Sequence, residues 1–242
     1  MMDLSDRLQE ILRAIVEEYI SSSEPVGSET IVKKYNIGVS PATVRNVMVS
    51  LTREGYLNQP HTSAGRIPSC QGIKLYIDTL MKENQLSVRD EVTIKEYLWE
   101  ERYNLNKLLR NSVHQLADRS KTLSVIATDS GDVYFAGLSH ILDLPEFYDI
   151  DLTKSVLSLI DEVSTLEEIL NRTVGQDDVH VLFGEELGIE NLAPCSFIFA
   201  HFGSGEKSGS VGLIGPSRLP YARLIPTVRY FSNLLTDITG SW

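Results

Sequence analysis

Side chains that can form paired hydrogen bonds gather on one short segment, "SPATVRNVMVSLTREGYL", residues 40–57. At about 100° per residue, its apolar side chains fall on one side of a helix; these are Val44, Val47, Met48 and Leu51. The opposite side is small and polar, with Ala42, Thr43, Arg45, Asn46, Val49, Ser50 and Arg53. Arginine and asparagine can each form two hydrogen bonds to the edge of a guanine or an adenine, and small neighbours let a helix enter a groove about 12 Å wide. This face therefore has the chemistry of recognition by hydrogen bonding.

The neighbouring segments must position that helix. Ser40 is a favoured N-cap, Pro41 suits the first helical position, and Gly55 predicts the end of the helix. Two helices are predicted before it, an amphipathic one ending near residue 22 and a short one, "ETIVKKYN", capped by Ser28. Three helices with a tight turn between the second and third form a helix-turn-helix. The segment "GYLNQPHTSAGRIPS" then predicts strand, loop and strand, which together make a wing.

This arrangement predicts a winged helix-turn-helix that binds double-stranded DNA, with three groups of contacts. Base contacts are expected from Thr43, Arg45, Asn46 and Arg53. Wing contacts are expected from His61 and Arg66, the arginine being suited to the negative potential of a narrow minor groove. Phosphate contacts are expected from Ser28, Lys33, Lys34 and Ser40.

The distribution of charge agrees with a small surface that faces phosphate. The chain of 242 residues has a net charge of −11, which by itself disfavours nucleic acid. Residues 31–66 nevertheless hold five basic residues and one acidic residue, whereas residues 67–242 hold 15 basic and 25 acidic residues. The alternative is that the polar face is merely solvated, or that the winged helix is a protein-interaction module.

The rest of the sequence predicts a different kind of structure. An amphipathic helix is expected over about residues 88–119, with Leu105 and Leu108 in its apolar stripe, and we expect it to serve as a spacer, a dimer contact or both. From Thr122 the pattern becomes mixed α and β, with "TLSVIATDSGDVYFAGL" predicting two strands around a turn. Arg218, Tyr221 and Arg223 could hold an anionic ligand, but an ion pair with the acidic body is the favoured interpretation.

No pattern in the sequence indicates catalysis or a cofactor. The five histidines and two cysteines have no metal-ligand spacing, no nucleophile motif occurs, and no apolar run is long enough to span a membrane. We therefore expect no metal, no cofactor and no enzymatic activity. Because the N-terminal residues also lack the pattern of a secretory signal, a cytoplasmic location is expected.

Three runs of residues resemble a known family. They are Glu24–Ser28 (EPVGS), Ser40–Asn46 (SPATVRN) and Gln59–Arg66 (QPHTSAGR), and the similarity is dense over about residues 4–81. It returns at "YFAGLSHILDLPEF" and "GSVGLIGPSRLPYARLIPTVRYFSNLL". The sequence thus resembles the heat-inducible transcription repressor family, HrcA.

The resemblance implies a homodimeric repressor that binds an inverted-repeat operator of chaperone genes, has a GAF-like second domain, and is kept active by the chaperonin GroEL. Members of the family are typically longer, and "TLSVIAT" runs here almost directly into "DSGDVYFAGL". We therefore expect the inserted dimerisation region to be absent from this shortened member. The prediction is a mixed α+β protein with a winged helix-turn-helix domain over 1–81, a connecting or dimer helix over 82–121, and a reduced GAF-like regulatory domain over 122–242. A ligand-sensing winged-helix regulator, or an interaction module without chaperone-gene targets, is the alternative.

Overall fold

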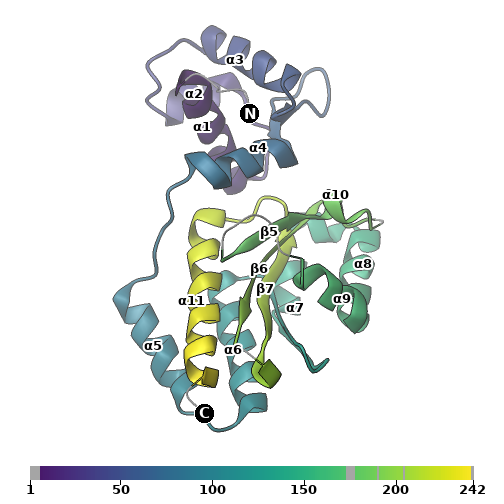
Figure 1. Ribbon diagram of the computed structural model, residues 1–242. Coiled ribbons are helices and arrows are strands. Elements are labelled where there is room, and N and C mark those ends of the chain that lie inside the picture. Colours follow the sequence, from purple (N-terminus) through teal and green to yellow (C-terminus); the bar gives the residue numbers. More distant parts are fainter. Residues whose placement is uncertain (1–5, 173–177, 190, 204, 241–242) are drawn as a thin grey trace. The chain divides into compact units, whose positions relative to one another are not determined.

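The protein is described by a computed structural model that covers residues 6–172, 178–189, 191–203 and 205–240. The chain forms two compact units (Figure 1). The first unit runs to Lys82 and includes Pro220–Ala222, and the second unit contains Glu83–Leu219 and the residues from Arg223 onward. Each unit has its own hydrophobic core, so each is described by itself.

The first unit is three helices followed by a small hairpin and a fourth, short helix. Its helices are α1 (Asp6–Ser22), α2 (Ser28–Lys34), α3 (Pro41–Arg53) and α4 (Cys70–Leu75), and a π-helical turn, Tyr76–Leu80, continues α4. Strands β1 (Leu57–Asn58) and β2 (Ile67–Pro68) pair antiparallel, with Leu57 opposite Pro68. The buried stripe of α1 packs with the apolar sides of α2 and α3 into one core. This confirms the predicted helix-turn-helix and wing.

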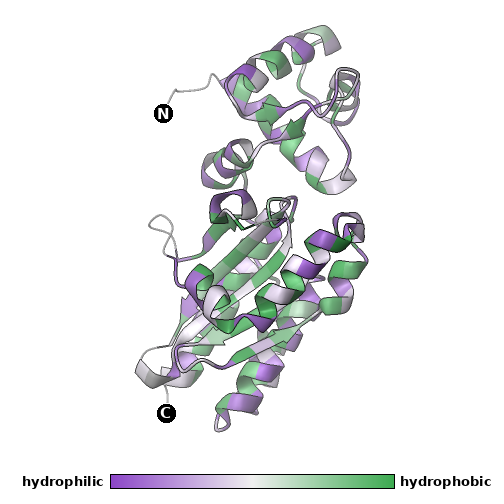
Figure 2. Cartoon of the chain, turned by 90° about the vertical axis from the view of Figure 1, so that its right-hand side faces the viewer, coloured by the Kyte–Doolittle hydropathy of each residue, from purple (hydrophilic) through white to green (hydrophobic). Residues whose placement is uncertain are grey.

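The second unit is built on a five-stranded antiparallel sheet. Its strands are β3 (Leu123–Thr128), β4 (Val133–Ala136), β5 (His180–Phe183), β6 (Cys195–Phe202) and β7 (Gly209–Pro216), in the order β4-β3-β7-β6-β5. The strands are mostly apolar, as Figure 2 shows, because all but the edges of the sheet are buried. A turn in which the Thr128 hydroxyl accepts from the backbone N–H of Asp132 joins β3 to β4.

Helices cover both faces of this sheet. One face packs against short helices that come between β4 and β5: α7 (Leu138–Leu142), the 3₁₀ turn Pro145–Tyr148, α8 (Ile150–Asp161) and α9 (Val163–Leu170). A further short helix, α10 (Gly184–Leu187), follows β5. Helix α6 (Leu105–Ser120) packs against β3 and β4. Helix α11 (Tyr221–Gly240) closes the described chain, and it belongs to this unit from Arg223 onward. The unit is the mixed α and β architecture expected of a GAF-like domain.

The single helix predicted over residues 88–119 is two helices. Helix α5 (Val88–Trp99) ends before a short turn, and Asn104 then starts α6 by accepting a hydrogen bond from the backbone N–H of Lys107. Helix α6 belongs to the core of the second unit, because Leu108 is fully buried. The expectation that Leu108 forms a dimer contact is therefore wrong, whereas Leu105 is half-buried.

Candidate nucleic-acid interface

Helix α3 is fixed at both ends by the residues that the sequence indicated. The Ser40 hydroxyl accepts a hydrogen bond of 3.2 Å from the backbone N–H of Thr43, and Pro41 is the first helical residue. Gly55 follows the helix with φ of +84°, a conformation that glycine adopts without steric cost. The cap and the stop leave thirteen residues in α3, which is enough for three turns that can cross a groove.

The packing of α3 turns its polar face outward. Val44, Met48 and Leu51 are buried in the core of the first unit. Arg45 and Asn46 lie between these anchors and are exposed. Of the four predicted base contacts, Arg45, Asn46 and Arg53 are exposed, and Thr43 is half-buried. The Thr43 and Ser40 hydroxyl oxygens lie 3.0 Å apart at the amino end of α3, where helix N–H groups and the helix dipole favour an anion such as phosphate.

The tip of the wing is organised by a residue that the sequence analysis did not single out. The Gln59 side-chain amide donates to the backbone carbonyls of Thr62 (2.9 Å) and Ala64 (3.4 Å). The backbone N–H of Ala64 also donates to the carbonyl of His61. The imidazole of His61 is therefore presented on a short, internally bonded loop, and it is exposed as predicted. A glutamine directly after the first strand of a wing is a weak signal, which explains why it was missed.

Arg66 lies at the base of the wing, not at its tip. Its backbone N–H and carbonyl both pair with Val26, and its Nε donates to the Thr52 hydroxyl over 3.0 Å. Thr52 in turn donates to the carbonyl of Met48 on α3. The Arg66 guanidinium is half-buried and ties the wing to α3, which differs from the expected insertion into a minor groove.

Gly65 permits this close approach of the wing to the segment before α2. A Cβ at position 65 would lie 2.4 Å from the carbonyl oxygen of Val26, which is too close for any side chain. Only glycine fits at this position, which explains sterically why the run "SAGR" contains a glycine.

A concave surface lies between the start of α2, the outer face of α3 and the wing. Its lining includes Arg45 and Val49 from α3, and Thr30 from α2. Thr62 and Ser63 contribute from the wing. Arg45 thus opens onto a largely polar surface that includes the half-buried Val49. This composition suits base edges and the methyl group of thymine. Thr30 and Val49 were not among the predicted contacts, although Val49 was visible on the outer side of the helical wheel.

The phosphate contacts predicted on α2 have other partners in the structure. Lys34 Nζ lies 2.6 Å from Glu18 Oε1, and the Glu18 side chain is only 6% exposed. Lys34 therefore neutralises a buried carboxylate of α1. Lys33 is exposed and lies 3.8 Å from the carboxylate of Glu29, a pair of little energetic weight. Ser28 is buried and is the first residue of α2, so Gly27 occupies the N-cap position predicted for Ser28.

Two tyrosines of the first unit, the half-buried Tyr35 and the buried Tyr76, have raised pKa values. Burial, together with the nearby Glu18 and Glu17 carboxylates, raises the pKa of Tyr35 to about 12. Burial raises the pKa of Tyr76 to about 12 as well. Both phenols stay protonated at neutral pH and therefore add no negative charge to the first unit.

The arginines that could have held an anionic ligand in the second unit also have protein partners. Arg218 forms a two-pronged ion pair with Glu146, with Nε–Oε1 and Nη2–Oε2 distances of 2.5 and 2.9 Å. Arg223 donates to the carbonyls of Arg119 and Ser120 at the end of α6. Tyr221 is fully buried. These contacts favour the structural interpretation of the three residues over a ligand site.

The described part of the chain contains neither a cluster of metal ligands nor a membrane-spanning helix. None of its His, Cys, Asp and Glu side chains form a group of three or more that could hold a metal ion. None of its helices is long and apolar enough to cross a membrane. Cys70 and Cys195 are not joined by a disulfide, and burial raises the pKa of Cys195 to about 12.

Comparison with protein families gives a match that spans most of the chain. The model described as "HrcA protein C terminal domain" matches residues 40–225. A heat-inducible transcription repressor HrcA of Caldanaerobacter subterraneus subsp. tengcongensis is 31% identical over 341 residues, with 98% of each chain covered. That of Carboxydothermus hydrogenoformans is 29% identical over 341 residues, with 98% of this chain and 99% of the relative covered. Both alignments are longer than the 242 residues of this chain, so the relatives contain residues with no counterpart here.

The fold also has a solved counterpart. The crystal structure of a protein described only as hypothetical superposes with a TM-score of 0.78 and 20% identity over 99% of both chains. At that identity the likeness shows the fold alone.

Proposed function

We propose that this chain, which belongs to the HrcA family of heat-inducible transcription repressors, represses heat-shock genes by binding their DNA through α3 and the wing. The observation that supports this proposal most directly is the outer face of α3. Arg45 and Asn46 are exposed there between buried anchors, and Arg45 lines the concave surface. The names of the relatives support the DNA-binding repressor function.

In the proposed complex α3 lies in the major groove. Arg45 and Asn46 hydrogen-bond to purine edges, and Arg53 extends the contact at the far end of the helix. The backbone N–H groups at the start of α3 and the Ser40 and Thr43 hydroxyls meet a phosphate. His61 reaches the DNA from the wing, while Arg66 holds the wing against α3.

We further propose that the protein acts as a cytoplasmic homodimer on an inverted repeat, because two copies related by a two-fold axis match two half-sites of opposite direction. Repression then follows from steric occlusion of the promoter, and the protein catalyses no reaction. The chaperonin GroEL is proposed as the partner that keeps the repressor active, on the resemblance to the family alone.

The proposal is tested by a quantitative mobility-shift titration with a duplex that carries a chaperone-promoter inverted repeat and a scrambled duplex of the same composition. Arg45→Ala should weaken binding to the repeat while leaving the affinity for the scrambled duplex nearly unchanged. Arg110→Ala serves as the matched control, because Arg110 is an exposed arginine on α6 in the second unit. If Arg110→Ala and Arg45→Ala weakened binding equally, the assignment of α3 as the reading helix would be wrong.

A further inference from the structure

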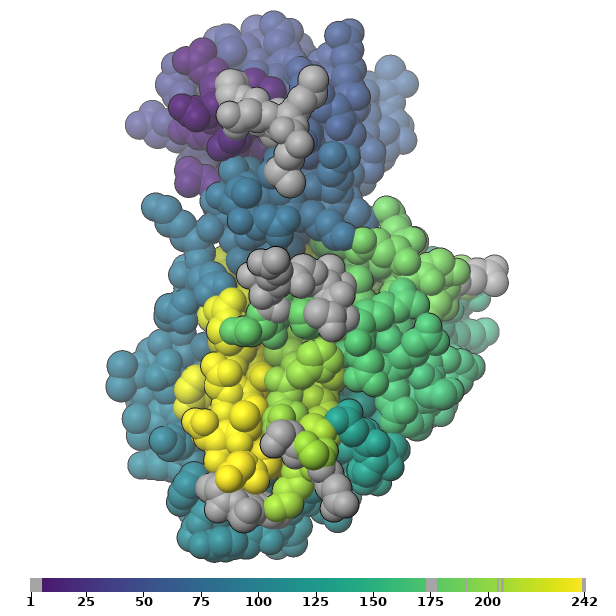
Figure 3. Space-filling model, in the orientation of Figure 1, coloured from purple at the N-terminus to yellow at the C-terminus, as the bar shows by residue number. Residues whose placement is uncertain are grey.

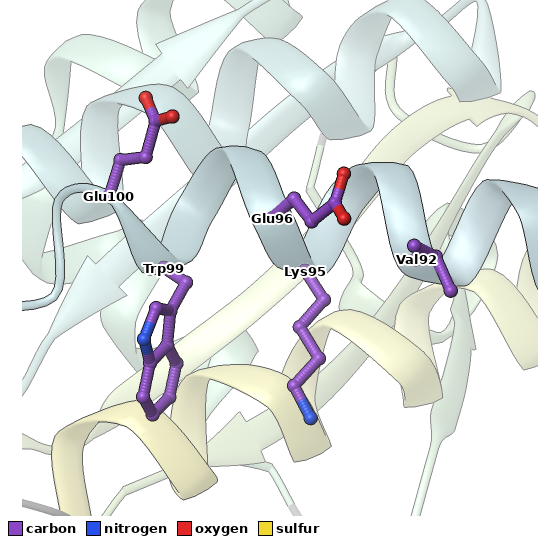
Figure 4. Close-up of a pocket in the computed structure, with 5 residues that line it drawn as sticks. All are labelled: Val92, Lys95, Glu96, Trp99 and Glu100. Atoms are coloured by element: carbon purple, nitrogen blue, oxygen red, sulfur yellow. The ribbon is translucent and has the colours of Figure 1, made fainter.

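Helix α5 has an exposed apolar stripe in addition to its buried face. Ile94 and Leu98 are completely buried in the second unit. About 100° away around the helix, Val88, Val92 and Trp99 are 76%, 48% and 41% exposed. Figure 3 shows α5 at the surface of this unit, and Figure 4 shows Lys95 and Trp99 extending from the same side of the helix. A single exposed leucine or valine needs no explanation, but a stripe along three turns marks a surface for association.

The carboxyl end of this stripe has the residue types that dominate protein interfaces. The Arg102 guanidinium lies 5.4 Å from the ring centre of Trp99 and 4.4 Å from that of Tyr103. It also donates to the Trp99 carbonyl over 2.8 Å. Tyr103 is 79% exposed. Tryptophan, tyrosine and arginine are the commonest energetic centres of interfaces, and here the three are already held together before any partner binds.

The exposed side chains of α5 can pair with those of a second copy of the same helix. In an antiparallel pair of identical helices, each position faces the position at the same distance beyond the two-fold axis. With the axis between Lys95 and Glu96, Val92 of one copy faces Trp99 of the other. Val88 then faces the turn just beyond the end of α5 in the other copy, where Tyr103 lies. Lys95 of each copy then faces Glu96 of the other, which gives two attractive charge pairs at the centre. A helix face with this order fits a two-fold symmetric contact, in which the same patch is used on both subunits.

We propose that α5 is the homodimer contact of this chain, packed antiparallel against α5 of a second copy through Val88, Val92, Lys95, Glu96, Trp99 and Tyr103. The proposal rests on the proposed function, since it supplies the two-fold axis that an inverted repeat requires. It replaces the contact expected from the sequence at Leu108, which lies in the core. The relatives contain residues with no counterpart here, and the proposed contact uses only residues that this chain contains.

The first test is sedimentation equilibrium of the full chain at micromolar concentrations without DNA. The wild-type protein should be a dimer, and Trp99→Glu should raise the dimer dissociation constant roughly 30-fold or more, as expected for loss of an interface hot spot. Tyr97→Glu is the matched control, because Tyr97 is a similarly exposed aromatic residue (44%) on a different face of the same helix. Tyr97→Glu should leave the dimer intact. A monomeric wild type, or a Trp99→Glu dimer as tight as the wild type, would overturn the proposal.

The second test uses the central charges and is specific to the antiparallel register. Lys95→Glu alone and Glu96→Lys alone each place like charges opposite one another and should weaken the homodimer. Mixing these two variants should restore dimers, because the heterodimer then has opposite charges at both places. Adjacent residues on a helix do not face each other, so the exchange breaks no Lys95–Glu96 contact within one chain. Homodimers that are unaffected by either reversal, or a mixture that stays monomeric, would exclude this register.

Circular dichroism and urea unfolding of each variant separate misfolding from dissociation. Binding of a single operator half-site separates this proposal from the proposed function. A folded Trp99→Glu monomer that still binds the half-site supports both. A dimer that binds no operator DNA supports the α5 contact and contradicts the repressor function. Half-site binding by a monomeric wild type supports the repressor function and contradicts the α5 contact.

Discussion

At the scale of single residues, basic side chains of the same charge have different tasks in the first unit. Arg45 is exposed on the outer face of α3, whereas Lys34 pairs with the buried Glu18 and Arg66 donates to Thr52. The exposure of Arg45 could be predicted from the sequence, because helical periodicity decides which side faces the core. The partners of Lys34 and Arg66 could not be predicted, because Glu18 and Thr52 lie 16 and 14 residues away in the chain.

Arg45→Ala should cost about 1–3 kcal/mol of binding free energy at the cognate operator and should relax specificity there. The reason is the loss of a two-pronged hydrogen bond to a base. Titrations of operator variants, each with one altered base pair, measure this directly. A uniform loss on every sequence would instead show that Arg45 touches only the phosphate backbone.

Lys34→Ala should lower the free energy of unfolding by roughly 1–2 kcal/mol, a value between those of exposed and buried ion pairs. The cause is the Glu18 carboxylate, which is left without its cation in a nearly buried position. Urea denaturation checks the value, and Lys33→Ala is the control because its pair with Glu29 is exposed. Unchanged stability together with a shallower salt dependence of DNA binding would return Lys34 to the phosphate contacts.

At the scale of elements, the helix-turn-helix, the wing and the strands followed from capping residues, glycines and alternation of apolar residues. The interruption between α5 and α6 could not be predicted in this way, because the segment "EERYN" contains neither glycine nor proline. Apolar spacing continues on both sides of it, so periodicity alone joins the two helices. The break matters for function, since it buries the stripe of α6 in the core and leaves α5 with a second, exposed stripe.

Leu108→Ala should reduce the free energy of unfolding by about 2–5 kcal/mol, as for other fully buried leucines. Its oligomeric state at low denaturant should remain that of the wild type, because α6 packs within its own unit. Thermal unfolding and light scattering on the same samples distinguish these effects. A fully stable monomer would mean that Leu108 contacts a second copy instead.

At the scale of the whole molecule, the acidic charge is concentrated outside the first unit. Residues 31–66 are locally basic within a chain of net charge −11, which directs DNA to one surface and repels it from the rest. Within the second unit, the Glu83 carboxylate accepts from Arg229 Nη1 and Nη2 over 2.7 and 2.8 Å, joining residues 146 positions apart. That contact connects the start of the second unit to α11 and makes its stability depend on pH.

Arg229→Gln should destabilise the second unit at neutral pH, and the difference from wild type should shrink in acid. Hydrogen bonds from Arg229 lower the pKa of Glu83 below its ordinary value of 4.5. The stabilisation is therefore fully present above that value and is lost as the pH falls through the lower pKa of the folded state. Urea denaturation between about pH 6 and pH 3 measures the trend. A difference that stays constant over this range would rule out the carboxylate as its cause.

The measurement that tests the central claim most directly is a mobility-shift titration of the wild-type chain at two salt concentrations. It compares a chaperone-promoter inverted repeat, a single half-site and a scrambled duplex. A dimeric repressor should bind the repeat far more tightly than the half-site, and the scrambled duplex least, with affinity falling as salt rises. Equal affinity for all three duplexes would contradict sequence-specific repression by this chain.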